Sequence, residues 1–328
     1  MRVRLGILLA AVFSIVPLSA SGQSYPSRTI TMLVPFPAGS GPDVYARLIG
    51  TKMAANLGQS VVIENRPGAG GAIGGRALAR SEPDGYTIMF GSTSSVLIAP
   101  AIAKDTPYDP VQAFTPVIQV ARGPFILSVR SGLPIHNLQE FIAYAKANPS
   151  KLNYGSSGIG SLHHLSTELL KHVAKINLTH IPYPGGAQSW TALQTDVVDL
   201  IFDSMPGPIS SLQADKARAI AVTGSKRLGS LAAAPMMAAV PTFAEQGLPD
   251  VDVVFWFGIV APAGTPADVV SRLNAAVTAS MQDSSVKERF AQQGIEGAMD
   301  TPAEFADVIR KGAVQWQSLV TELDLKQK

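Results

Sequence analysis

The feature that most constrains the fold is an apolar strand that runs through a glycine- and proline-rich turn into a helix. The strand covers residues 30–34, and the helix is expected from about Pro42 to Leu57. The turn reads Val34-Pro35-Phe36-Pro37-Ala38-Gly39-Ser40-Gly41-Pro42-Asp43. Backbone N–H groups at a helix N-terminus carry partial positive charge and favour an anion. Because the turn contains no lysine or arginine, we expect backbone dipoles, hydroxyls or water to hold such an anion.

The same strand–loop–helix unit recurs along the chain and predicts an α/β fold. Residues 61–63 are expected to form a short buried strand, and residues 86–90 a third strand after a short helix. Strands that alternate with helices imply right-handed crossovers and a mostly parallel sheet. A second glycine-rich loop, at residues 155–161, begins another series of such units, so we expect a second α/β half.

Two segments are expected to carry the chain between the halves. The first is at Gly123-Pro124, and the second is the apolar strand at residues 255–260. The helices that follow have no strand after them, so they are expected to pack on the first half. We therefore predict one lobe formed by residues 25–123 plus 255–328 and another formed by residues 124–254.

The N-terminus has the pattern of a secretory signal. Arg2 and Arg4 precede an apolar run over residues 5–16, and small residues at 19–22 suit cleavage near residues 20–24. The run is shorter than the roughly 20 residues that span a bilayer. With no cysteine in the chain there is no site for lipid attachment. We expect residues 1–24 to be removed and the mature protein to be periplasmic, without direct membrane insertion.

The composition indicates a globular protein and excludes some partners. Of the 328 residues, 46% are hydrophobic and 15% charged, which suits a protein with substantial cores. Without Arg2 and Arg4, 24 basic residues remain against 24 acidic ones. A neutral chain has no general attraction to nucleic acid or anionic membranes, so no nucleic-acid partner is expected.

Glycine, serine or aspartate stands at five predicted strand ends. These are residues 36–43, 91–95, 155–161, 184–187 and 203. Ligands of open α/β sheets bind beyond the carboxyl ends of the strands. Each position alone could be an ordinary tight turn, but five in two α/β halves favour a shared cleft.

A nucleotide site is disfavoured by the spacing of the glycines. Gly39-Ser40-Gly41 and Gly158-Ile159-Gly160 lack the third glycine of the dinucleotide motif, and Gly68-Ala69-Gly70 has Ile73 where that glycine is required. The phosphate-binding motif GxxxxGK[ST] is absent from the sequence. No cofactor is predicted.

A serine hydrolase is the main enzymatic alternative. Ser156, Ser157, His163, His164 and Asp203 include the residue types of a catalytic triad. The nucleophile elbow G-x-S-x-G is absent, because isoleucine stands at its last position. Serines in a glycine loop more often donate hydrogen bonds to a ligand, so we predict a protein that is not an enzyme.

His164, Glu168 and His172 have a four-residue spacing that can hold a metal ion on a helix. They lie at the edge of the helix's predicted apolar face, so we interpret them as structural or surface residues and predict no metal. His164 adjoins the second glycine loop and remains a candidate ligand contact. Asp43 and Asp203 have two interpretations each, local capping or contact with a ligand hydroxyl or ammonium.

Several longer motifs resemble a known protein family. They are Tyr25-Pro26-Ser27-Arg28, Val34-Pro35-Phe36-Pro37, Val62-Ile63-Glu64-Asn65-Arg66-Pro67-Gly68-Ala69-Gly70-Gly71, Pro83-Asp84-Gly85-Tyr86-Thr87, Pro107-Tyr108-Asp109-Pro110, Leu152-Asn153-Tyr154-Gly155-Ser156, His180-Ile181-Pro182-Tyr183, Asp199-Leu200-Ile201-Phe202-Asp203 and Trp256-Phe257-Gly258. With these motifs the chain resembles the Bug family, the TctC-like extracytoplasmic solute receptors of tripartite tricarboxylate transporters. The resemblance covers essentially the whole mature chain.

This resemblance implies a two-lobed periplasmic binding protein fold, type II-like, in which two α/β lobes close on a carboxylate. It implies a receptor that presents a small organic acid to large and small membrane transporter subunits, and a monomer is expected. A ligand-binding sensor of a signalling system is the nearest alternative. The candidate ligand-binding residues are Phe36, Pro37, Ala38, Gly39, Ser40, Asp43, Gly91, Ser92, Ser156, Ser157, Gly158, Ser161, His164, Gly185, Gly186, Ala187 and Asp203.

Three positions depart from the family pattern. The first loop has Ala38-Gly39-Ser40-Gly41 where the family usually has Pro-Gly-Gly. Ala99-Pro100 stands where Asn-Pro is usual, and Pro184 stands where a lysine or arginine is common. The loss of these polar groups suggests a ligand whose distal end is less charged or more apolar.

Overall fold

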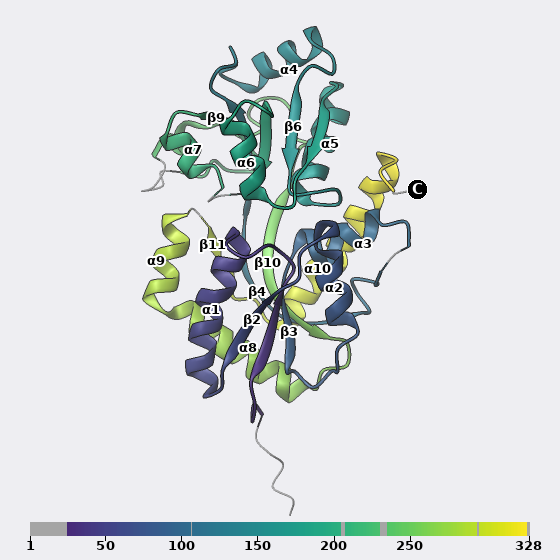
Figure 1. The fold of residues 1–328 in the computed structure, drawn as a ribbon, viewed down its shortest axis with the longest axis vertical. Coiled ribbons are helices and arrows are strands. Elements are labelled where there is room, and N and C mark those ends of the chain that lie inside the picture. Colours follow the sequence, from purple (N-terminus) through teal and green to yellow (C-terminus); the bar gives the residue numbers. More distant parts are fainter. Residues whose placement is uncertain (1–24, 106, 205–206, 230–234, 294, 327–328) are drawn as a thin grey trace, which may run out of the picture.

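The computed structural model describes residues 25–105, 107–204, 207–229, 235–293 and 295–326. The predicted signal at residues 1–24 lies outside the described residues. Within them, two sheets form, and each is flanked by helices (Figure 1). The half with the first sheet lies at the bottom of Figure 1 and the half with the second at the top, with β10 extending between them. This arrangement matches the predicted two-lobed α/β fold.

The first sheet has six strands in the order β11-β4-β10-β3-β1-β2. Its strands are β1 (Ile30–Val34), β2 (Val61–Asn65), β3 (Thr87–Ser92), β4 (Phe114–Pro124), β10 (Val254–Pro262) and β11 (Glu296–Gly297). The α-helices of this half are α1 (Gly41–Leu57), α2 (Ala72–Ala79), α3 (Ala99–Ile102), α8 (Ala267–Gln282), α9 (Ser284–Gln292) and α10 (Pro302–Glu322). The 3-10 helix η1 (Ala69–Gly71) and the π-helical segment η2 (Thr93–Ile98) precede α2 and α3.

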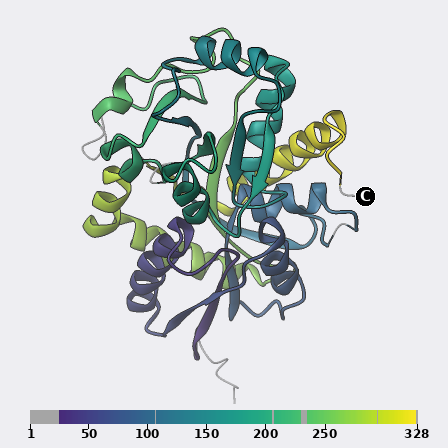
Figure 2. The ribbon, with the colours of Figure 1, turned by 45° about the horizontal axis from the view of Figure 1, so that its top comes forward.

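The second sheet has five strands in the order β7-β6-β8-β5-β9. Its strands are β5 (Ile126–Arg130), β6 (Asn153–Ser156), β7 (Thr179–Pro182), β8 (Leu200–Asp203) and β9 (Ala217–Val222). The helices of this half are α4 (Leu138–Ala147), α5 (Leu162–Ala174), α6 (Gly186–Gln194), α7 (Ile209–Gln213) and the 3-10 helix η3 (Pro235–Ala239). The tilted view in Figure 2 shows the helices of this half beside its strands.

Both sheets are mixed, which corrects the expectation of mostly parallel sheets. In the first sheet only the β2-β1-β3 part is parallel, because β10 pairs antiparallel with both β3 and β4. In the second sheet β5 pairs antiparallel with β8 and β9. β5 and β10 are each the first strand after the chain passes from one half to the other. No βαβ connection within the same sheet leads into them, so nothing requires them to pair in parallel with their neighbours.

The strand predicted over residues 61–63 forms, as β2, but it is not buried. It is the edge strand of its sheet, and Val62 keeps 52% of its surface exposed. An apolar run alone does not distinguish a central strand from an edge strand, since that depends on which neighbours pair with it.

The two connections between the halves run side by side. Val254 at the start of β10 pairs with Pro124 at the end of β4, and Phe255 pairs with Gly123. Beyond these pairs the chain enters the second sheet at Ile126. The chain therefore passes between the two sheets near residues 124–126 and before Val254, and the division into two lobes stays a prediction.

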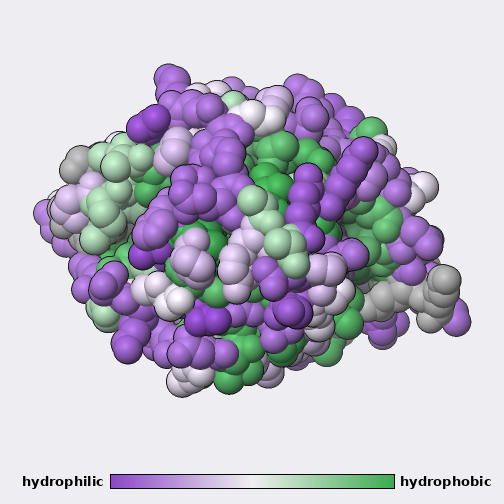
Figure 3. All heavy atoms as spheres, turned by 90° about the horizontal axis from the view of Figure 1, so that it is seen from above, coloured by the Kyte–Doolittle hydropathy of each residue, from purple (hydrophilic) through white to green (hydrophobic). Residues whose placement is uncertain are grey.

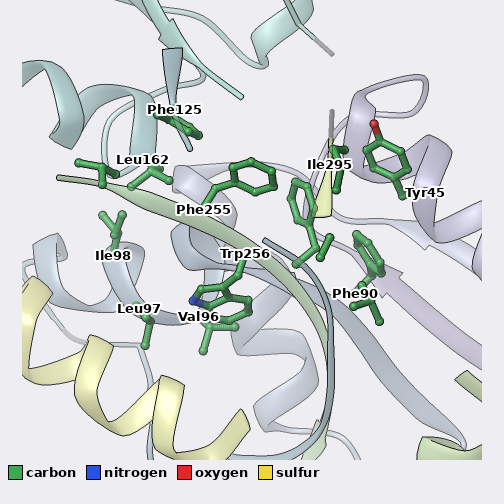
Figure 4. Close-up of a cluster of buried hydrophobic side chains, with 14 of the residues drawn as sticks. Tyr45, Phe90, Val96, Leu97, Ile98, Phe125, Leu162, Phe255, Trp256 and Ile295 are labelled. Carbon is green, nitrogen blue, oxygen red and sulfur yellow. The ribbon is translucent and has the colours of Figure 1, made fainter. Parts of the chain in front are cut away.

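Buried side chains continue from one half into the other. Figure 4 shows two residues of the second half, Phe125 just before β5 and Leu162 at the start of α5. They lie close to Phe255 of β10 and Ile98 of η2, and all four belong to one hydrophobic cluster. The backbone N–H of Leu162 also donates to Ser94 Oγ, 2.9 Å away. These contacts hold the start of α5 against η2 and so set the distance between the halves at this point.

Capping groups define the ends of several helices. Gly58 ends α1 in the left-handed conformation, with φ of 69°. Ser161 caps α5 by accepting from the His164 N–H, and Thr301 and Glu304 form a reciprocal capping box at the start of α10. The π-helical segment η2, with Ser92 and Ser95 in a similar box, was missed by the sequence analysis, which read residues 91–95 only as a strand end.

Seen from above relative to Figure 1, the surface is mostly hydrophilic, with smaller hydrophobic areas between polar side chains (Figure 3). Among the described residues, the large hydrophobic side chains that are exposed come from separate elements, such as Ile73 of α2, Val197 after α6 and Val314 of α10. Single exposed hydrophobic residues of this kind are normal for a globular protein.

Candidate ligand-binding site

A cavity of about 350 Å³ lies between the two halves, at the carboxyl ends of β1, β3, β6 and β8. This is the edge where the sequence predicted a shared cleft. The volume suits a small molecule. Its lining consists of Phe36, Pro37, Gly39, Ser40, Gly41, Pro42, Tyr45, Ser92, Thr93, Ser94, Phe125, Ser157, Leu162, His163, Gly185, Gly186, Ala187, Trp190, Thr191, Gln194, Asp203, Ser204, Gly207, Ser210, Phe255, Trp256 and Phe257.

Aromatic side chains form the part of the lining nearest the crossing strands. The ring centroids of Phe125 and Phe255 lie 6.1 Å apart, and those of Phe255 and Phe257 lie 5.3 Å apart. Tyr45 of α1 lies 6.2 Å from Phe257. Figure 4 shows Phe125, Phe255 and Tyr45 along this route from the second half to the first. This wall favours an apolar or planar group in the ligand.

A chain of polar contacts forms the wall that belongs to the second half. Ser157 Oγ lies 2.8 Å from His163 Nδ1, and His163 Nε2 lies 2.8 Å from Asp203 Oδ1. The indole Nε1–H of Trp190 donates to Asp203 Oδ2 over 2.7 Å, and the Ser204 N–H donates to Oδ1 over 2.7 Å. Asp203 is only 8% exposed, so these donors replace the water that the carboxylate loses on burial.

The cavity lining contains few ionisable groups. Asp203 is its one carboxylate, and no lysine or arginine is among the described residues that line it. Burial raises the pKa of the Tyr45 phenol well above its ordinary value, so Tyr45 is neutral at physiological pH. His163 is the remaining ionisable group in the lining.

The first glycine loop is partly closed by its own aspartate. Asp43 Oδ2 accepts from the Gly39 N–H over 2.8 Å, and the Ser40 hydroxyl donates to the Pro37 carbonyl over 2.7 Å. Asp43 is 2% exposed and does not line the cavity, so its role is to hold the loop. The N–H of Gly41, in the first turn of α1, has no acceptor within its helix and lies at the cavity.

The second glycine loop divides into residues that face the cavity and residues that support it. Ser157 lines the cavity, whereas Ser156 is fully buried with its Oγ 2.6 Å from His180 Nε2. The Ser161 hydroxyl donates to the Gly158 carbonyl over 2.7 Å. Ser156 and Ser161 therefore fix the shape of the loop that presents Ser157.

His164 lies in a stack of rings behind this loop. Its imidazole stacks on His180 at 4.4 Å, and His180 stacks on Tyr154 at 4.6 Å. Burial lowers the pKa values of both histidines, that of His180 to about 4. His164 does not line the cavity, and its buried position differs from the partly solvated flank expected from helix periodicity.

The three residues whose spacing could hold a metal ion, His164, Glu168 and His172, contact different neighbours. Glu168 accepts from the Tyr154 hydroxyl and pairs with Lys171, 2.7 Å away, whereas exposed His172 lies 3.3 Å from Glu322 of α10. Among the described residues, no group of histidine, aspartate and glutamate side chains is arranged to hold a metal ion.

The structure brings ten of the predicted site residues to the cavity and leaves seven outside its lining. Those that line it are Phe36, Pro37, Gly39, Ser40, Ser92, Ser157, Gly185, Gly186, Ala187 and Asp203. Those that do not are Ala38, Asp43, Gly91, Ser156, Gly158, Ser161 and His164. Ser156, Gly158 and Ser161 bond within their loop, and a Cβ on Gly91 would lie 2.9 Å from Val96 Cγ2, so this glycine permits close packing of η2.

Sequence reasoning missed several lining residues on elements without glycine loops. Tyr45 lies one turn inside α1, Trp190 lies inside α6, and Phe125 and Phe255 belong to the crossings. The sequence does show aromatic residues such as Phe125 and Phe255 in the segments that cross between the halves. Their orientation was not, because it depends on how the two sheets face each other.

A second cavity of about 330 Å³ adjoins the first and shares Phe36, Pro37 and Ser157 with it. Glycines of η1 and the tip of the second glycine loop complete it. Gly158, Ser161 and Pro184 line this second space. The first and second glycine loops therefore border both cavities, and η1 borders the second.

Residues 45–325 match the family model described as the tripartite tricarboxylate transporter family receptor, TctC. The chain belongs to this family. Over 99% of its length it is 37% identical to a UPF0065 protein from the tcbD-tcbE intergenic region of Pseudomonas sp. strain P51, of which the match covers 94%. It is also 35% identical to the protein BugT of Bordetella pertussis, over 99% of this chain and 97% of BugT.

Solved structures of TctC-type proteins have the same fold. The periplasmic binding protein BugD has a TM-score of 0.85 and 33% identity, covering 93% of this chain and 100% of BugD. MatC of Rhodopseudomonas palustris with bound malate has a TM-score of 0.84 and 33% identity, over 90% of this chain and 100% of MatC. Rpa4515 of R. palustris with adipate has a TM-score of 0.84 and 34% identity, covering 92% and 98%.

Of the three positions expected to differ from the TctC family pattern, Ala38, Ala99 and Pro184, only Pro184 lines either of the two cavities described. Ala38 is exposed at the first loop, Ala99 is buried in α3, and Pro184 lines the second cavity. None of them places a cation at the site. Within the described residues, no helix is both long enough and apolar enough to cross a membrane.

Proposed function

We propose that this protein is a receptor that captures a small carboxylated compound between two lobes, residues 25–123 plus 255–328 and residues 124–254. Closure of the lobes would remove water from the carboxylate and strengthen its hydrogen bonds. The observation that carries the proposal is the cavity of about 350 Å³ between the halves, whose walls combine hydroxyls, backbone N–H groups and aromatic rings. The organic acids named with two related structures, malate and adipate, support this ligand class.

Within this class, the lining favours an acid with an uncharged, apolar body. No described lysine or arginine lines the cavity, so a second or third carboxylate would have no fixed cation to meet. The aromatic wall of Phe125, Phe255 and Phe257 offers a surface for a ring or an alkyl chain. We therefore expect a monocarboxylate or aromatic acid to bind more tightly than a tricarboxylate.

The direct experiment is mass spectrometry of whatever acid co-purifies with the protein, followed by calorimetry with that acid. Thermal shifts with benzoate, adipate, malate and citrate then rank the ligand class. A larger shift with benzoate than with citrate is expected. A clear preference for citrate would reject the apolar-body proposal while keeping the receptor.

A variant that narrows the cavity tests its location. Ala187 is exposed and lines the cavity at the start of α6, whereas Val197 is exposed after α6 and is not part of the lining. Ala187→Trp is expected to abolish or strongly weaken binding, and Val197→Trp to leave it unchanged. Equal affinity in both variants would place the ligand elsewhere.

We further propose that the mature protein is a periplasmic monomer that hands its ligand to large and small membrane transporter subunits. Membership of the TctC receptor family supports this role. A sensor that hands its ligand to a signalling partner is the alternative. Pull-down of the membrane subunits by the ligand-loaded protein distinguishes transport from sensing.

The contact chain Ser157–His163–Asp203 gives a specific reason to test a second function, serine-dependent hydrolysis. Both of its distances are 2.8 Å, but the serine faces Nδ1 and the aspartate Nε2, the reverse of the arrangement in a catalytic triad, and the buried Nε2 has no hydrogen-bond partner among the described residues. We propose that the chain binds rather than cleaves. Hydrolysis of p-nitrophenyl acetate that disappears in Ser157→Ala would contradict this.

A further inference from the structure

The second cavity, of about 330 Å³, lies between the two halves, as the first one does. Its lining comes from segments 35–37 and 68–71 of the first half and segments 157–161 and 182–184 of the second. Close contacts between the halves border it. A Cβ on Gly70 would lie 2.8 Å from the Gly160 carbonyl oxygen, and a Cβ on Gly185 would lie 3.3 Å from Pro37 Cγ. The second cavity is therefore complete only while the halves are in contact.

One side chain from each half separates the second cavity from the first. Phe36 of the first half and Ser157 of the second half line both cavities, with Pro37 beside Phe36. Phe36 is only partly buried. Because Phe36 and Ser157 belong to different halves, a ligand that is in place before the halves close can extend between them.

Several polar groups of the second cavity are already engaged within the protein. The Gly71 N–H donates to the Gly68 carbonyl over 2.9 Å. In the second glycine loop, the Gly158 N–H donates to Ser156 Oγ over 3.1 Å, and the Ser161 hydroxyl donates to the Gly158 carbonyl over 2.7 Å. These donors are not available to hold an anion.

The side chains that line the second cavity are mainly apolar. Four of them are prolines, at positions 35, 37, 182 and 184, and proline has no backbone N–H to offer. No described lysine, arginine, histidine, aspartate or glutamate is part of this lining. Ile159 keeps 44% of its surface exposed here, so an apolar group that covers it gains the free energy of burial. The chemistry of the second cavity suits an uncharged hydrocarbon group.

We propose that the second cavity is a subsite for the far end of an elongated monocarboxylate. Its carboxylate lies in the first cavity, and its alkyl or aryl tail passes between Phe36 and Ser157. The carboxylate end belongs in the first cavity because the Gly41 N–H, which has no acceptor within α1, lies there. The tail contacts both halves and so favours their closure. This inference rests on the proposed function.

A chain-length series measures the subsite directly. Butyrate, hexanoate, octanoate and decanoate are titrated into the full-length mature protein by calorimetry. Affinity is expected to rise about fourfold for each CH₂ group that becomes buried. The rise is expected to continue through the acids whose tails reach beyond Phe36 and Ser157.

Two tryptophan variants separate the cavities. Pro184→Trp fills the second cavity and is expected to lower affinity for decanoate far more than for butyrate, so that the rise with chain length stops earlier. Ala187→Trp narrows the first cavity and is expected to weaken binding of every acid in the series. Val197→Trp is the control, because Val197 is exposed and lines neither cavity. A series for Pro184→Trp that follows the wild type at every length would overturn the subsite.

Pro184→Lys tests the orientation of the ligand. The new ammonium group lies at the far end of the proposed ligand, where an ion pair at an exposed position gains up to about fivefold in affinity. This gain is expected for suberate, which carries a second carboxylate, and not for octanoate. An equal gain for octanoate would place its carboxylate in the second cavity and overturn the inference while leaving the receptor intact. Failure of every acid to bind the wild-type protein would overturn the proposed function as well.

Discussion

The carboxylate of Asp43 accepts a hydrogen bond from the backbone N–H of Gly39, 2.8 Å away, so the chain's own anion occupies part of the first glycine loop. Arg47 Nε and Asn65 Nδ2 donate to the same carboxylate over 3.0 and 2.8 Å. The Asn65 amide also reaches the Phe36 carbonyl. Loop, helix α1 and strand β2 are thereby joined at one buried charge next to the cavity.

Asp43→Asn is expected to destabilise the protein by about 1.5–3 kcal/mol, because the amide's NH₂ group cannot accept the hydrogen bonds that the carboxylate accepts. Chemical denaturation at pH 7 measures the change. The control is Asp307→Asn, in an exposed pair with Arg310 on α10, where a change below about 0.5 kcal/mol is expected. Equal changes in the free energy of unfolding for the two substitutions would show that Asp43 does not hold the loop.

The Asp43 carboxyl also sets a pH dependence. Burial raises its pKa, but hydrogen bonds from Arg47, Asn65 and Gly39 outweigh burial and leave the pKa below its ordinary value. A lowered carboxyl pKa stabilises the fold above the unfolded-state value, and this contribution is lost as pH falls below about 4. Acid unfolding of Asp43→Asn should therefore show a smaller loss of stability over that range than the wild type.

Ser156 and Ser157 are expected to respond differently to alanine. Ser156→Ala removes the buried partner of His180 and of the Gly158 N–H, so it should lower stability by about 1–3 kcal/mol. Ser157→Ala removes a group that lines the cavity and should mainly weaken binding of the acid. Thermal unfolding and calorimetry on both variants test this division. A large stability loss in Ser157→Ala with unchanged affinity would reverse the assignment.

The contact between η1 and the second glycine loop is tested by Gly70→Ala. A Cβ on Gly70 would lie 2.8 Å from the carbonyl carbon and oxygen of Gly160, in the other half. Gly58, with a similar positive φ, has nothing within 4 Å and serves as the control. Each alanine costs about 1–2 kcal/mol for its left-handed backbone, but only Gly70→Ala should separate the halves and weaken ligand binding. Similar affinities in the two variants would show that this contact does not govern closure.

The buried ring stack predicts a second pH effect. Burial first, and then the nearby His164, lower the pKa of His180 to about 4. The unfolded chain therefore binds a proton on His180 at a higher pH than the folded chain does. Stability from this group is complete above about pH 6.5 and is lost as pH falls toward 4. His180→Gln should flatten the dependence of the melting temperature in this window, and His136→Gln, at an exposed residue, should not.

Much of the fold followed from the sequence. Alternating apolar segments and glycine turns predicted the alternation of strands and helices, because these signals act within a few neighbouring residues. The aromatic strand at residues 255–260 and the break at Gly123-Pro124 predicted the crossings. The antiparallel pairings of β5 and β10 and the edge position of β2 did not follow, since pairing joins segments far apart in the chain.

The candidate site shows the same division most clearly in two adjacent histidines. The sequence by itself determined that both would lie in the first turn of α5, beside a glycine loop. Only the tertiary structure decided between them: His164 stacks on His180 behind the loop, and His163 reaches Ser157 and Asp203 in the cavity wall. Successive side chains on a helix point about 100° apart. Which of the two faces the cavity depends on where β6, β7 and β8 place their ends around the helix, and that is set by packing across the whole second half.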